Sequence, residues 1–258
     1  MNCWYMNGAG NDFMVIDARG LDLDFSALAL RLCAMTGADG FMAVDHSEIA
    51  DFKLHFYNSD GSRGEMCGNG SRCVCRFAYE HGIAGTDMTV ETDAGLVRGH
   101  RISESQYRVQ LNNPGILDLH RRPDAAYVEL GTPGVPHGVV ALEHLEFSDR
   151  EALRQRAVAL RHDPAFPKGA NINFYTWIGK AEIRVLTYER GVEDYTLACG
   201  TGCGSTAAVL WLRGELPGGQ LTAQVPGGTL RLTVDGTSDR VEMLLLEGPT
   251  ELVRTYEI

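Results

Sequence analysis

The stretch CGNGSRCVCRFAYEHG, residues 67–82, has a counterpart in CGTGCGSTAAVLWLRGEL, residues 199–216. In both, a cysteine opens a glycine-rich turn, and the residues that follow predict a helix that ends near Gly82 or Gly214. The two cysteines are 199 − 67 = 132 positions apart in a chain of 258 residues. A repeat at this spacing predicts two similar halves, each with one such turn and helix.

Short apolar segments surround both helices, and their alternation with polar residues is typical of strands. Two further helices are expected, at residues 26–33, with Ser26 as the N-cap, and at residues 150–161. We therefore expect an α+β fold in which each half wraps strands around one central helix. The expected strands are a strand–turn–strand unit at 3–17, then 41–45, 52–57, 88–92, 107–112, 127–130, 138–142, 171–178, 182–188, 221–225, 229–234 and 241–246.

The segment PGILDLHRRPD, residues 114–124, interrupts this pattern and is the expected linker between the halves. We accordingly expect an N-terminal half at residues 1–116 that carries Cys67 and a C-terminal half at residues 117–258 that carries Cys199. The last strand could pack back on the N-terminal half. If the halves face each other, the two cysteine turns meet in the cleft between them.

The chain is acidic, with 23 Lys and Arg against 34 Asp and Glu and a formal charge of −11. This balance argues against nucleic acid or an anionic membrane surface as a partner. The opening MNCWYMNGAGNDF lacks the basic and apolar regions of a signal peptide, and no segment approaches the ~18 apolar residues of a membrane span. We therefore expect a cytoplasmic protein whose cysteines are reduced.

A cysteine at each helix start indicates acid–base chemistry. The N-terminus of a helix stabilises an anion, so a thiol there is expected to have a lowered pKa. The neighbouring glycines leave backbone N–H groups uncovered that can hold a carboxylate. With an α-amino acid between the two sulfurs, one thiolate removes the α-proton and the opposite thiol returns one to the other face. Such a racemase or epimerase needs no cofactor.

Other interpretations of the cysteines stay open. Four of them, Cys67, Cys73, Cys199 and Cys203, could bind zinc, although the gap of five residues between the first two is long for such a site. Cys67 and Cys199 could be ordinary buried thiols, as lone cysteines usually are. A phosphate-binding loop is disfavoured because no Gly-Lys-Ser/Thr follows either turn.

With these residues identified, the chain resembles the diaminopimelate epimerase family along nearly all of its length. The resemblance implies two pseudo-symmetric halves, each a strongly curved and mostly antiparallel sheet around a central helix, with the active site between them. It also implies catalysis without pyridoxal phosphate. The motifs that carry it are NGAGNDF at 7–13, GADG at 37–40, YNSDGSRGEMCGNGSRC at 57–73, PH at 136–137, NINF at 171–174, YERG at 188–191, TLACGTG at 196–202, PGG at 226–228 and GP at 248–249.

The resemblance assigns Cys67 and Cys199 as the acid–base pair. It further implies that the backbone around both cysteines binds the reacting carboxylate and that a second group of residues binds the distal end of the substrate. Asn58 could instead be only a turn residue, Glu189 and Arg190 could form only surface ion pairs, and His137 is interpreted as structural. The implied substrate-binding residues are Gly68, Asn69, Gly200 and Thr201 at the carboxylate, Asn58, Asn171 and Arg190 at the distal carboxylate, Glu189 at the distal ammonium, and Asn11 in the same pocket.

Departures from the family pattern concern the expected pocket. Gly40 stands where Gln often follows GAD, and Val135 stands where the family often has Asn before Pro-His. The segment at 33–37 is shorter than usual, and the one at 191–197 is about one residue longer.

The leading hypothesis is epimerisation of LL- to meso-diaminopimelate for lysine and peptidoglycan synthesis. The alternatives are a racemase of another amino acid such as histidine, or an amino-acid-binding protein without turnover. A phenazine-biosynthesis-type isomerase is disfavoured because that class lacks the cysteine pair. A homodimer is possible, whereas closure of the halves and the isomer that each cysteine deprotonates stay open.

Overall fold

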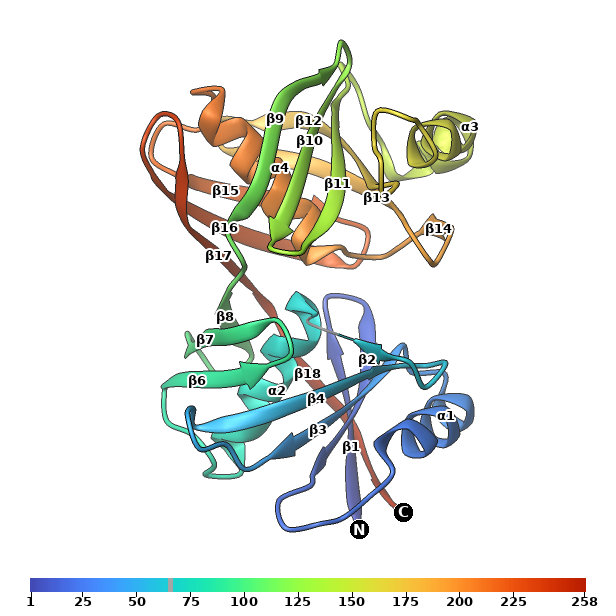
Figure 1. The fold of residues 1–258 in the computed structure, drawn as a ribbon, viewed down its shortest axis with the longest axis vertical. Helices are drawn as coiled ribbons and strands as arrows, with labels where there is room; N and C mark the ends of the chain where they lie inside the picture. The colour runs from blue at the N-terminus through green and yellow to red at the C-terminus, as the bar shows by residue number, and fades with distance from the viewer. Residues whose placement is uncertain (65–66) are drawn as a thin grey trace. The chain divides into compact units, whose positions relative to one another are not determined.

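The computed structural model describes residues 1–64 and 67–258, and the chain divides into two compact units (Figure 1). Unit 1 contains Met1–Gln110 and Glu247–Ile258, and unit 2 contains Leu111–Leu246. The first crossing between the units therefore falls at Gln110 and Leu111, ahead of the boundary after residue 116 that the sequence suggested. Glu65 and Met66, which belong to the motif at 57–73, lie outside the described residues.

Unit 1 is one sheet that encloses the helix α2 (Gly68–Glu80). Its strands pair in the order β18–β1–β2–β3–β4–β6–β7–β8, and the short β5 also pairs with β4. Neighbours are antiparallel except β2–β3 and β4–β6, which are parallel and flank α1 (Phe25–Thr36) and α2 in the sequence. The strands are β1 Asn2–Gly8, β2 Asn11–Asp17, β3 Gly40–Asp45, β4 Phe52–Asn58, β5 Arg63–Gly64, β6 Asp87–Thr92, β7 Gly95–Arg101, β8 Gln106–Gln110 and β18 Glu251–Glu257.

Unit 2 repeats this pattern around α4 (Gly200–Leu212). Its strands pair in the order β9–β10–β11–β12–β13–β15–β16, and the short β14 also pairs with β13. The parallel pairs are β11–β12, which flank α3 (Arg150–Arg161), and β13–β15, which flank α4. The strands are β9 Pro114–Arg122, β10 Ala125–Gly131, β11 Gly134–Ala141, β12 Asn171–Gly179, β13 Glu182–Glu189, β14 Asp194–Tyr195, β15 Gln220–Val225, β16 Gly228–Gly236 and β17 Val241–Pro249. A short 3-10 helix, Phe147–Asp149, precedes α3, and β17 ends within unit 1.

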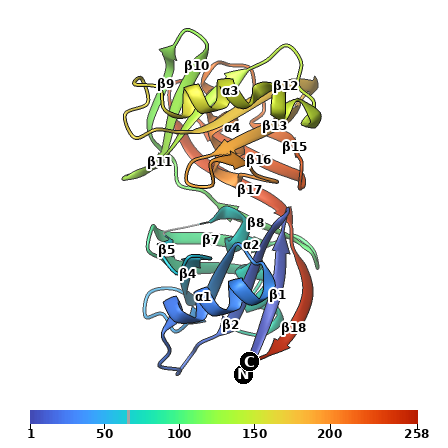
Figure 2. The same cartoon turned by 90° about the vertical axis from the view of Figure 1, so that its right-hand side faces the viewer.

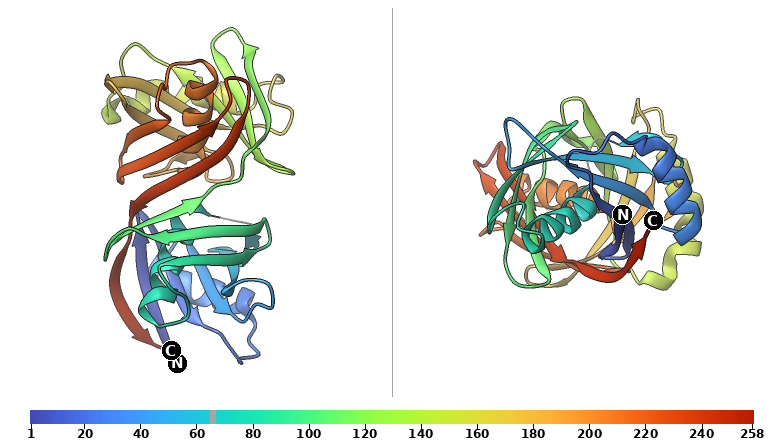
Figure 3. Two further views of the ribbon diagram at one scale, coloured as in Figure 1. Left: turned by 90° about the vertical axis from the view of Figure 1, so that its left-hand side faces the viewer. Right: turned by 90° about the horizontal axis from the view of Figure 1, so that it is seen from below.

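The prediction of an α+β fold with two similar halves, each a mostly antiparallel sheet around a central helix, is confirmed. Both central helices are buried on nearly every side, and α2 contacts β1, β2, β3, β7 and β8 while α4 contacts β9–β12 and β16. The two halves differ in the origin of one edge strand. The strand beside β1 is β18, from the end of the chain, whereas the equivalent strand beside β10 is β9, which directly precedes it. The two chain ends accordingly lie together in unit 1, and the Met1 amino group donates to the Ile258 carbonyl at 2.8 Å (Figure 3).

Strands β2 and β3 are buried on both faces because α1 covers one face and α2 the other (Figure 2). Met14 and Phe41 belong to the core against α1. Phe13 and Met42 instead lie against Gly70 of α2. These strands consequently read as unbroken apolar runs and not as an alternation.

Two expectations from the sequence are wrong. The expected linker at residues 114–124 is the strand β9, which pairs with β10. The N-cap of α1 is Asp24, whose carboxylate accepts the N–H of Ala27 at 3.0 Å. Ser26 lies two residues further on, within the first turn of the helix, and donates its hydroxyl to the Gly61 carbonyl at 2.8 Å. Asp24 caps the helix because its carboxylate reaches the Ala27 N–H, one of the first-turn N–H groups that the helix itself leaves unpaired.

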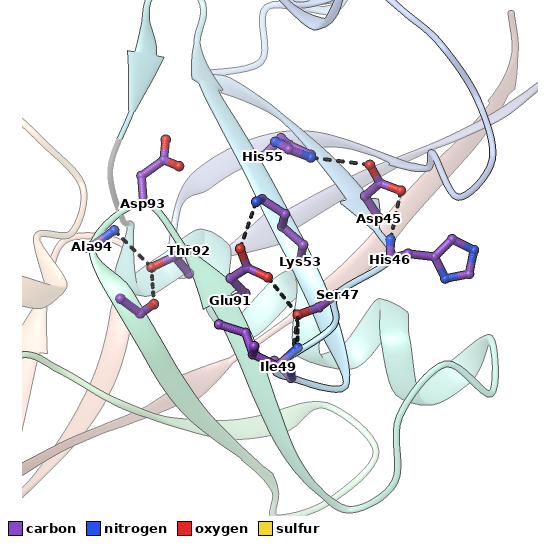
Figure 4. A network of polar contacts seen from close by, with 12 residues as sticks. Asp45, His46, Ser47, Ile49, Lys53, His55, Glu91, Thr92, Asp93 and Ala94 are labelled. Atoms are coloured by element: carbon purple, nitrogen blue, oxygen red, sulfur yellow. Dashed lines mark hydrogen bonds and ion pairs between the residues drawn. The ribbon is translucent and has the colours of Figure 1, made fainter.

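A polar network joins β3, β4 and β6 on the unit 1 sheet (Figure 4). Lys53 Nζ donates to Glu91 Oε1 at 2.7 Å, and the Ser47 hydroxyl donates to Glu91 Oε2 at 2.7 Å. On the neighbouring strands, His55 Nε2 lies 3.4 Å from Asp45 Oδ2. Lys53 and Glu91 are also register partners in the short parallel pair β4–β6. The network therefore reinforces the sheet, and the predicted site residues lie elsewhere.

No helix in residues 1–64 or 67–258 is long and apolar enough to cross a membrane.

The packing of α4 generates a prediction about Gly202. A Cβ on Gly202 would lie 2.1 Å from Asn173 Oδ1. Asn173 cannot yield easily because it is buried and bonded to the Thr187 hydroxyl and the Gly138 carbonyl, at 2.9 and 3.0 Å. Gly202→Ala is therefore expected to lower the free energy of unfolding by about 1–3 kcal/mol, measured by urea denaturation.

Gly85→Ala is the matched control, since the atom closest to its added Cβ, the Asp87 carbonyl oxygen, would be 3.9 Å away. Equal stability of the Gly202→Ala variant and the wild type would contradict this account of the packing.

Candidate active site

Cys67 and Cys199 occupy the same position in the two units, as the N-cap residues of α2 and α4. Their backbone angles are nearly equal, with φ −129° and ψ 117° at Cys67 and φ −122° and ψ 102° at Cys199. The carbonyl of each accepts the first helical hydrogen bond, from Ser71 N at 2.7 Å and from Cys203 N at 3.0 Å. The repeat inferred from the sequence thus places each sulfur at a helix N-terminus, where N–H groups face outward from the helix.

The residues directly after each cysteine form the first helical turn. Gly68 and Asn69 are the first two residues of α2, and Gly200 and Thr201 are the first two of α4. Gly68, Asn69 and Gly200 are buried together with their helices. The first turn of a helix offers unpaired N–H donors and a positive dipole end, so each turn has the chemistry of an anion-binding site.

Cys199 is buried, and only 7% of its surface is exposed. Its Sγ lies 3.6 Å from the Thr201 hydroxyl oxygen. Burial first, and then the nearby Glu189 carboxylate, raise the pKa of the Cys199 thiol well above its usual value, although the Thr201 hydroxyl and the Gly202 N–H act to lower it. The expectation that the helix N-terminus lowers the pKa is therefore wrong for Cys199. Desolvation of the charged form outweighs the helix dipole here, and Cys199 is held as a thiol that can donate a proton.

This protonation state predicts how Cys199 reacts with iodoacetamide. Because only the thiolate is alkylated, labelling of Cys199 is expected to be slow near neutral pH and to rise about tenfold per pH unit up to at least pH ~9. Glu189→Gln should speed the labelling at any given pH, since it removes a negative charge beside the sulfur. Mass spectrometry of the peptide that contains Cys199 measures both rates, with urea-unfolded protein as the control. A rate that stays level across this pH range would show a thiolate and contradict the assignment.

In unit 1, the predicted residues Asn11 and Asn69 are in direct contact. Asn69 Nδ2 donates to Asn11 Oδ1 at 2.6 Å, and Asn69 is 2% exposed. Asn11 Nδ2 donates in turn to Asp39 Oδ2 at 3.1 Å. From the other side, Arg72 donates to Asn69 Oδ1 at 3.0 Å and to the Gly68 carbonyl at 3.2 Å. The Cys67 turn, the start of β2 and the segment ahead of β3 are thereby joined by side chains.

Asn58 ends β4 and opens the turn to β5. Its Nδ2 donates to the Ser62 hydroxyl at 3.0 Å, and its carbonyl accepts the N–H of Gly61 at 3.0 Å. The Asn58 side chain is exposed, and its contacts are those of a turn residue, which is one of the two roles that the sequence left open.

Gly40, a departure from the family pattern, is the register partner of Asn58. A Cβ on Gly40 would lie 2.8 Å from Phe56 Cε2 and 3.0 Å from the Tyr57 carbonyl. The Phe56 ring therefore takes the space that a side chain at position 40 would need. Val135, the other departure noted above, is the register partner of Leu130 between β10 and β11.

In unit 2, Asn171 and Arg190 are in direct contact. Asn171 is 5% exposed, and its Oδ1 accepts the backbone N–H of Arg190 at 2.8 Å. The exposed Arg190 guanidinium donates to the Lys168 carbonyl at 3.1 Å. Glu189 Oε2 accepts the Thr196 hydroxyl at 3.0 Å. The carboxylate and the guanidinium thus project from adjacent positions at the end of β13, close enough to Cys199 for Glu189 to affect that thiol.

His137 lies in β11 beside Asn171 on β12 and is fully buried. Its Nδ1 is 3.2 Å from Asn173 Nδ2. Burial, and then the positive charge of Arg190, lower the pKa of His137 to about 3. The ring is consequently neutral at physiological pH, which fits a structural role better than that of a charged ligand.

Among the described residues, taking each unit by itself, no group of three or more His, Cys, Asp or Glu side chains converges. All seven cysteines are among these residues, and all are thiols, not disulfides.

Comparison with known proteins identifies the family. The sequence model of diaminopimelate epimerase matches residues 3–114 and 131–253. The chain belongs to this family. The diaminopimelate epimerases of Aquifex aeolicus and a Hydrogenobaculum species are 37% and 36% identical to it, over 95% and 97% of this chain and 93% and 97% of theirs. Membership in the diaminopimelate epimerase family makes the protein an isomerase.

Solved structures support the fold independently of close sequence similarity. A phenazine biosynthesis protein of the PhzF family from Bacillus anthracis superposes with a TM-score of 0.76 at 15% identity, covering 100% of this chain and 98% of that one. A hydroxyproline epimerase from Agrobacterium vitis superposes with a TM-score of 0.73 at 16% identity, covering 99% and 91%. This chain therefore shares its fold with proteins of quite different sequence.

Sequence reasoning did not single out Arg72 or Asp39, although both contact predicted site residues. Asp39 lies in the GADG motif, but only its fold position next to β2 brings it to Asn11. Arg72 follows Gly68 by four residues and Asn69 by three, and this spacing places it on their face of the helix. This spacing was the sequence feature that could have identified Arg72 as a neighbour of the predicted site residues.

Proposed function

We propose that this protein epimerises LL-diaminopimelate to meso-diaminopimelate by a two-base mechanism that uses Cys67 and Cys199 and no cofactor. The observation that carries the proposal is the pair of cysteines with matching backbone geometry at the N-termini of two enclosed helices. Inversion at a carbon needs a base on one face and an acid on the other, and a repeated fold supplies one group from each half. The product would serve lysine and peptidoglycan synthesis.

In the proposed reaction, the thiolate of one cysteine takes the α-proton, so a C–H bond breaks and an S–H bond forms. The electron pair left on the α-carbon delocalises into the substrate carboxylate. The thiol of the other cysteine then delivers its proton to the opposite face and becomes the thiolate. First-turn N–H groups, from Gly68 and Asn69 in one unit and Gly200 and Thr201 in the other, would bind the carboxylate as its charge grows.

The raised pKa of Cys199 makes the two starting forms of the enzyme unequal. A thiolate at Cys199 is disfavoured, because it would be buried near Glu189. We therefore assign Cys67 as the base and Cys199 as the acid in the resting enzyme. After one turnover the roles are reversed, and the proton must return to Cys199 before the next molecule of the same isomer reacts.

The distal end of the substrate is assigned to Arg190, Asn171 and Asn58 at the carboxylate and to Glu189 at the ammonium. A guanidinium offers two parallel donors to a carboxylate, and a carboxylate suits an ammonium. Asn171 supports this placement because it holds the backbone of Arg190 at 2.8 Å. Asn11 is assigned to the same pocket through its contact with Asn69.

The two-thiol mechanism predicts the behaviour of cysteine variants. Cys67→Ala and Cys199→Ala are each expected to reduce epimerisation at least ~100-fold, because either change removes one of the two proton-transfer groups. Proton NMR in heavy water, under reducing conditions, follows the loss of the α-proton signal of LL-diaminopimelate and the appearance of the meso product.

Cys33→Ala is the control, since Cys33 is a buried thiol in the core against α1. It should keep wild-type turnover. If either active-site variant epimerises at the wild-type rate, the mechanism fails. Turnover of histidine or another amino acid in place of diaminopimelate would make the protein a racemase of that substrate, and no exchange with any amino acid would indicate a binding protein.

The distal assignment makes a separate prediction for Arg190. Arg190→Met is expected to raise the KM for diaminopimelate by roughly 10- to 100-fold with a smaller change in kcat, since a charged hydrogen bond to the substrate is lost. Arg190→Lys should recover only part of the affinity because an ammonium lacks the planar fork. Steady-state kinetics of the three proteins provide the test, and an unchanged KM would remove Arg190 from the pocket.

The cellular setting follows from the chemistry. Two reactive thiols that must both stay reduced suit a reducing compartment, so we propose the cytoplasm as the site of action. The acidic chain suits a free amino acid as its partner better than a nucleic acid or a membrane. A homodimer is part of the proposal and is tested by sedimentation equilibrium.

A further inference from the structure

We propose that Arg72 and Asp39 are positioning residues, which together fix the carboxamide orientations of Asn69 and Asn11 at the Cys67 turn. The inference rests on the proposed function, because it assigns a purpose to two residues beside the predicted substrate-binding groups. It concerns unit 1 alone, and every contact in it lies within that unit.

The relay begins at a buried cation. Arg72 lies in the second turn of α2, is 0% exposed, and is the largest of the fully buried side chains. Its guanidinium donates from one nitrogen to the Gly68 carbonyl at 3.2 Å and from another to Asn69 Oδ1 at 3.0 Å. A guanidinium has donors only, so the Asn69 atom that faces it must be the carboxamide oxygen.

The orientation of Asn69 then determines that of Asn11. With its oxygen toward Arg72, Asn69 presents its NH2 group to Asn11 and donates to Oδ1 at 2.6 Å. Asn11 must consequently present its own NH2 group on the other side, where it donates to Asp39 Oδ2 at 3.1 Å. A carboxylate only accepts, so the direction of this hydrogen bond is fixed as well.

The relay therefore has a donor terminus and an acceptor terminus, and the two carboxamides between them have one allowed sense. Rotating either amide by half a turn would set N–H against N–H or oxygen against oxygen. The energetic penalty of such a mismatch is highest at Asn69 and Arg72, which are 2% and 0% exposed. The carboxamide groups of Asn11 and Asn69 are thus held in one orientation before any substrate binds.

Asp39 also fixes where the relay is anchored. Its Oδ2 accepts the backbone N–H of Asp12 at 2.9 Å, and its own N–H donates to the Asp12 carbonyl at 2.8 Å. Asn7 Nδ2 donates to Asp12 Oδ1 at 2.8 Å from β1. The Asp39 carboxylate is therefore hydrogen-bonded to the β1–β2 hairpin, which carries Asn11. Asn11 in turn connects this hairpin to the first turn of α2 through Asn69.

Unit 2 lacks this device. The position equivalent to Arg72 is five residues after the cysteine, which is Gly204 in α4. A Cβ on Gly204 would lie 2.6 Å from Leu111 Cδ1, so no long side chain fits there without rearrangement. In the described part of the chain, Arg72 thus places a guanidinium against the Gly68 carbonyl in the first turn of α2, whereas α4 has Gly204 at the matching position.

The test combines substrate kinetics with NMR of the carboxamide groups. Asp39→Ala removes the acceptor terminus at an exposed position, and it is expected to raise the KM for diaminopimelate roughly 10-fold with little change in kcat. In the protein without substrate, the side-chain NH2 signals of Asn11 and Asn69, assigned with Asn11→Ala and Asn69→Ala, should shift and lose their protection from hydrogen exchange. Asp39→Asn retains one acceptor oxygen and should restore part of both properties.

Arg72→Met removes the donor terminus and should impair binding more than Asp39→Ala, and Arg72→Lys should recover part of the loss. Arg76→Met is the matched control. Arg76 lies on the same helix, and it donates to Glu80 at 2.7 Å and to the Thr250 carbonyl at 2.8 Å. Its variant should lose stability while the KM and the carboxamide signals stay as in the wild type. If Arg72→Met does not fold, Arg72→Lys and the Asp39 variants still decide the question.

The relay is overturned if Asp39→Ala and Arg72→Lys leave the carboxamide signals and the KM unchanged in an active enzyme. It is also overturned if Arg76→Met alters them as strongly, because the effect would then be one of general stability. Failure of the proposed function gives a different result. A wild type that exchanges no α-proton would show it, whereas the carboxamide signals, measured without substrate, would still report on the relay.

Discussion

The enclosure of a helix by its own sheet is the constraint on which both halves depend. Burial of α2 and α4 on nearly all sides leaves room only for small residues where strands cross closely, as at Gly70 and Gly202. A helix so enclosed still has unpaired N–H groups in its first turn, and these must face something other than the strands. One cysteine lies at each of these ends, as the N-cap residue of α2 and of α4.

The two halves use this common frame differently. The Cys67 turn is braced by a guanidinium and two carboxamides, whereas the Cys199 turn has a glycine in place of the arginine and a carboxylate, Glu189, near its sulfur. A duplicated fold therefore carries two electrostatically distinct ends. This difference suits a reaction in which the partners act as an acid and a base in turn, since identical ends would give no preference for the resting state.

Much of the fold was predictable from the repeat, and the exceptions have physical causes. The helix at Arg150–Arg161 and most interior strands were anticipated because their apolar patterns are strong. The strands β7, β9 and β18 were not anticipated. β9 and β18 are edge strands whose residues are largely exposed and so show no alternation. In β7, only Val97 and Gly99 are buried. β9 also begins at a proline, which in a sequence suggests a linker as readily as an edge. The residue types of the candidate site could be predicted, but the raised pKa of Cys199 and the contacts of Arg72 depend on burial, which a linear pattern does not report.

The position of β18 has a consequence for how the chain is made. Unit 2 is complete in sequence at Leu246, whereas the unit 1 sheet needs Glu251–Glu257 beside β1. During synthesis, then, unit 1 begins before unit 2 and its sheet is completed after it, and one edge of β1 stays unpaired until Glu251–Glu257 have left the ribosome. The sheet of unit 1 can therefore be completed only after all of unit 2 has been synthesised.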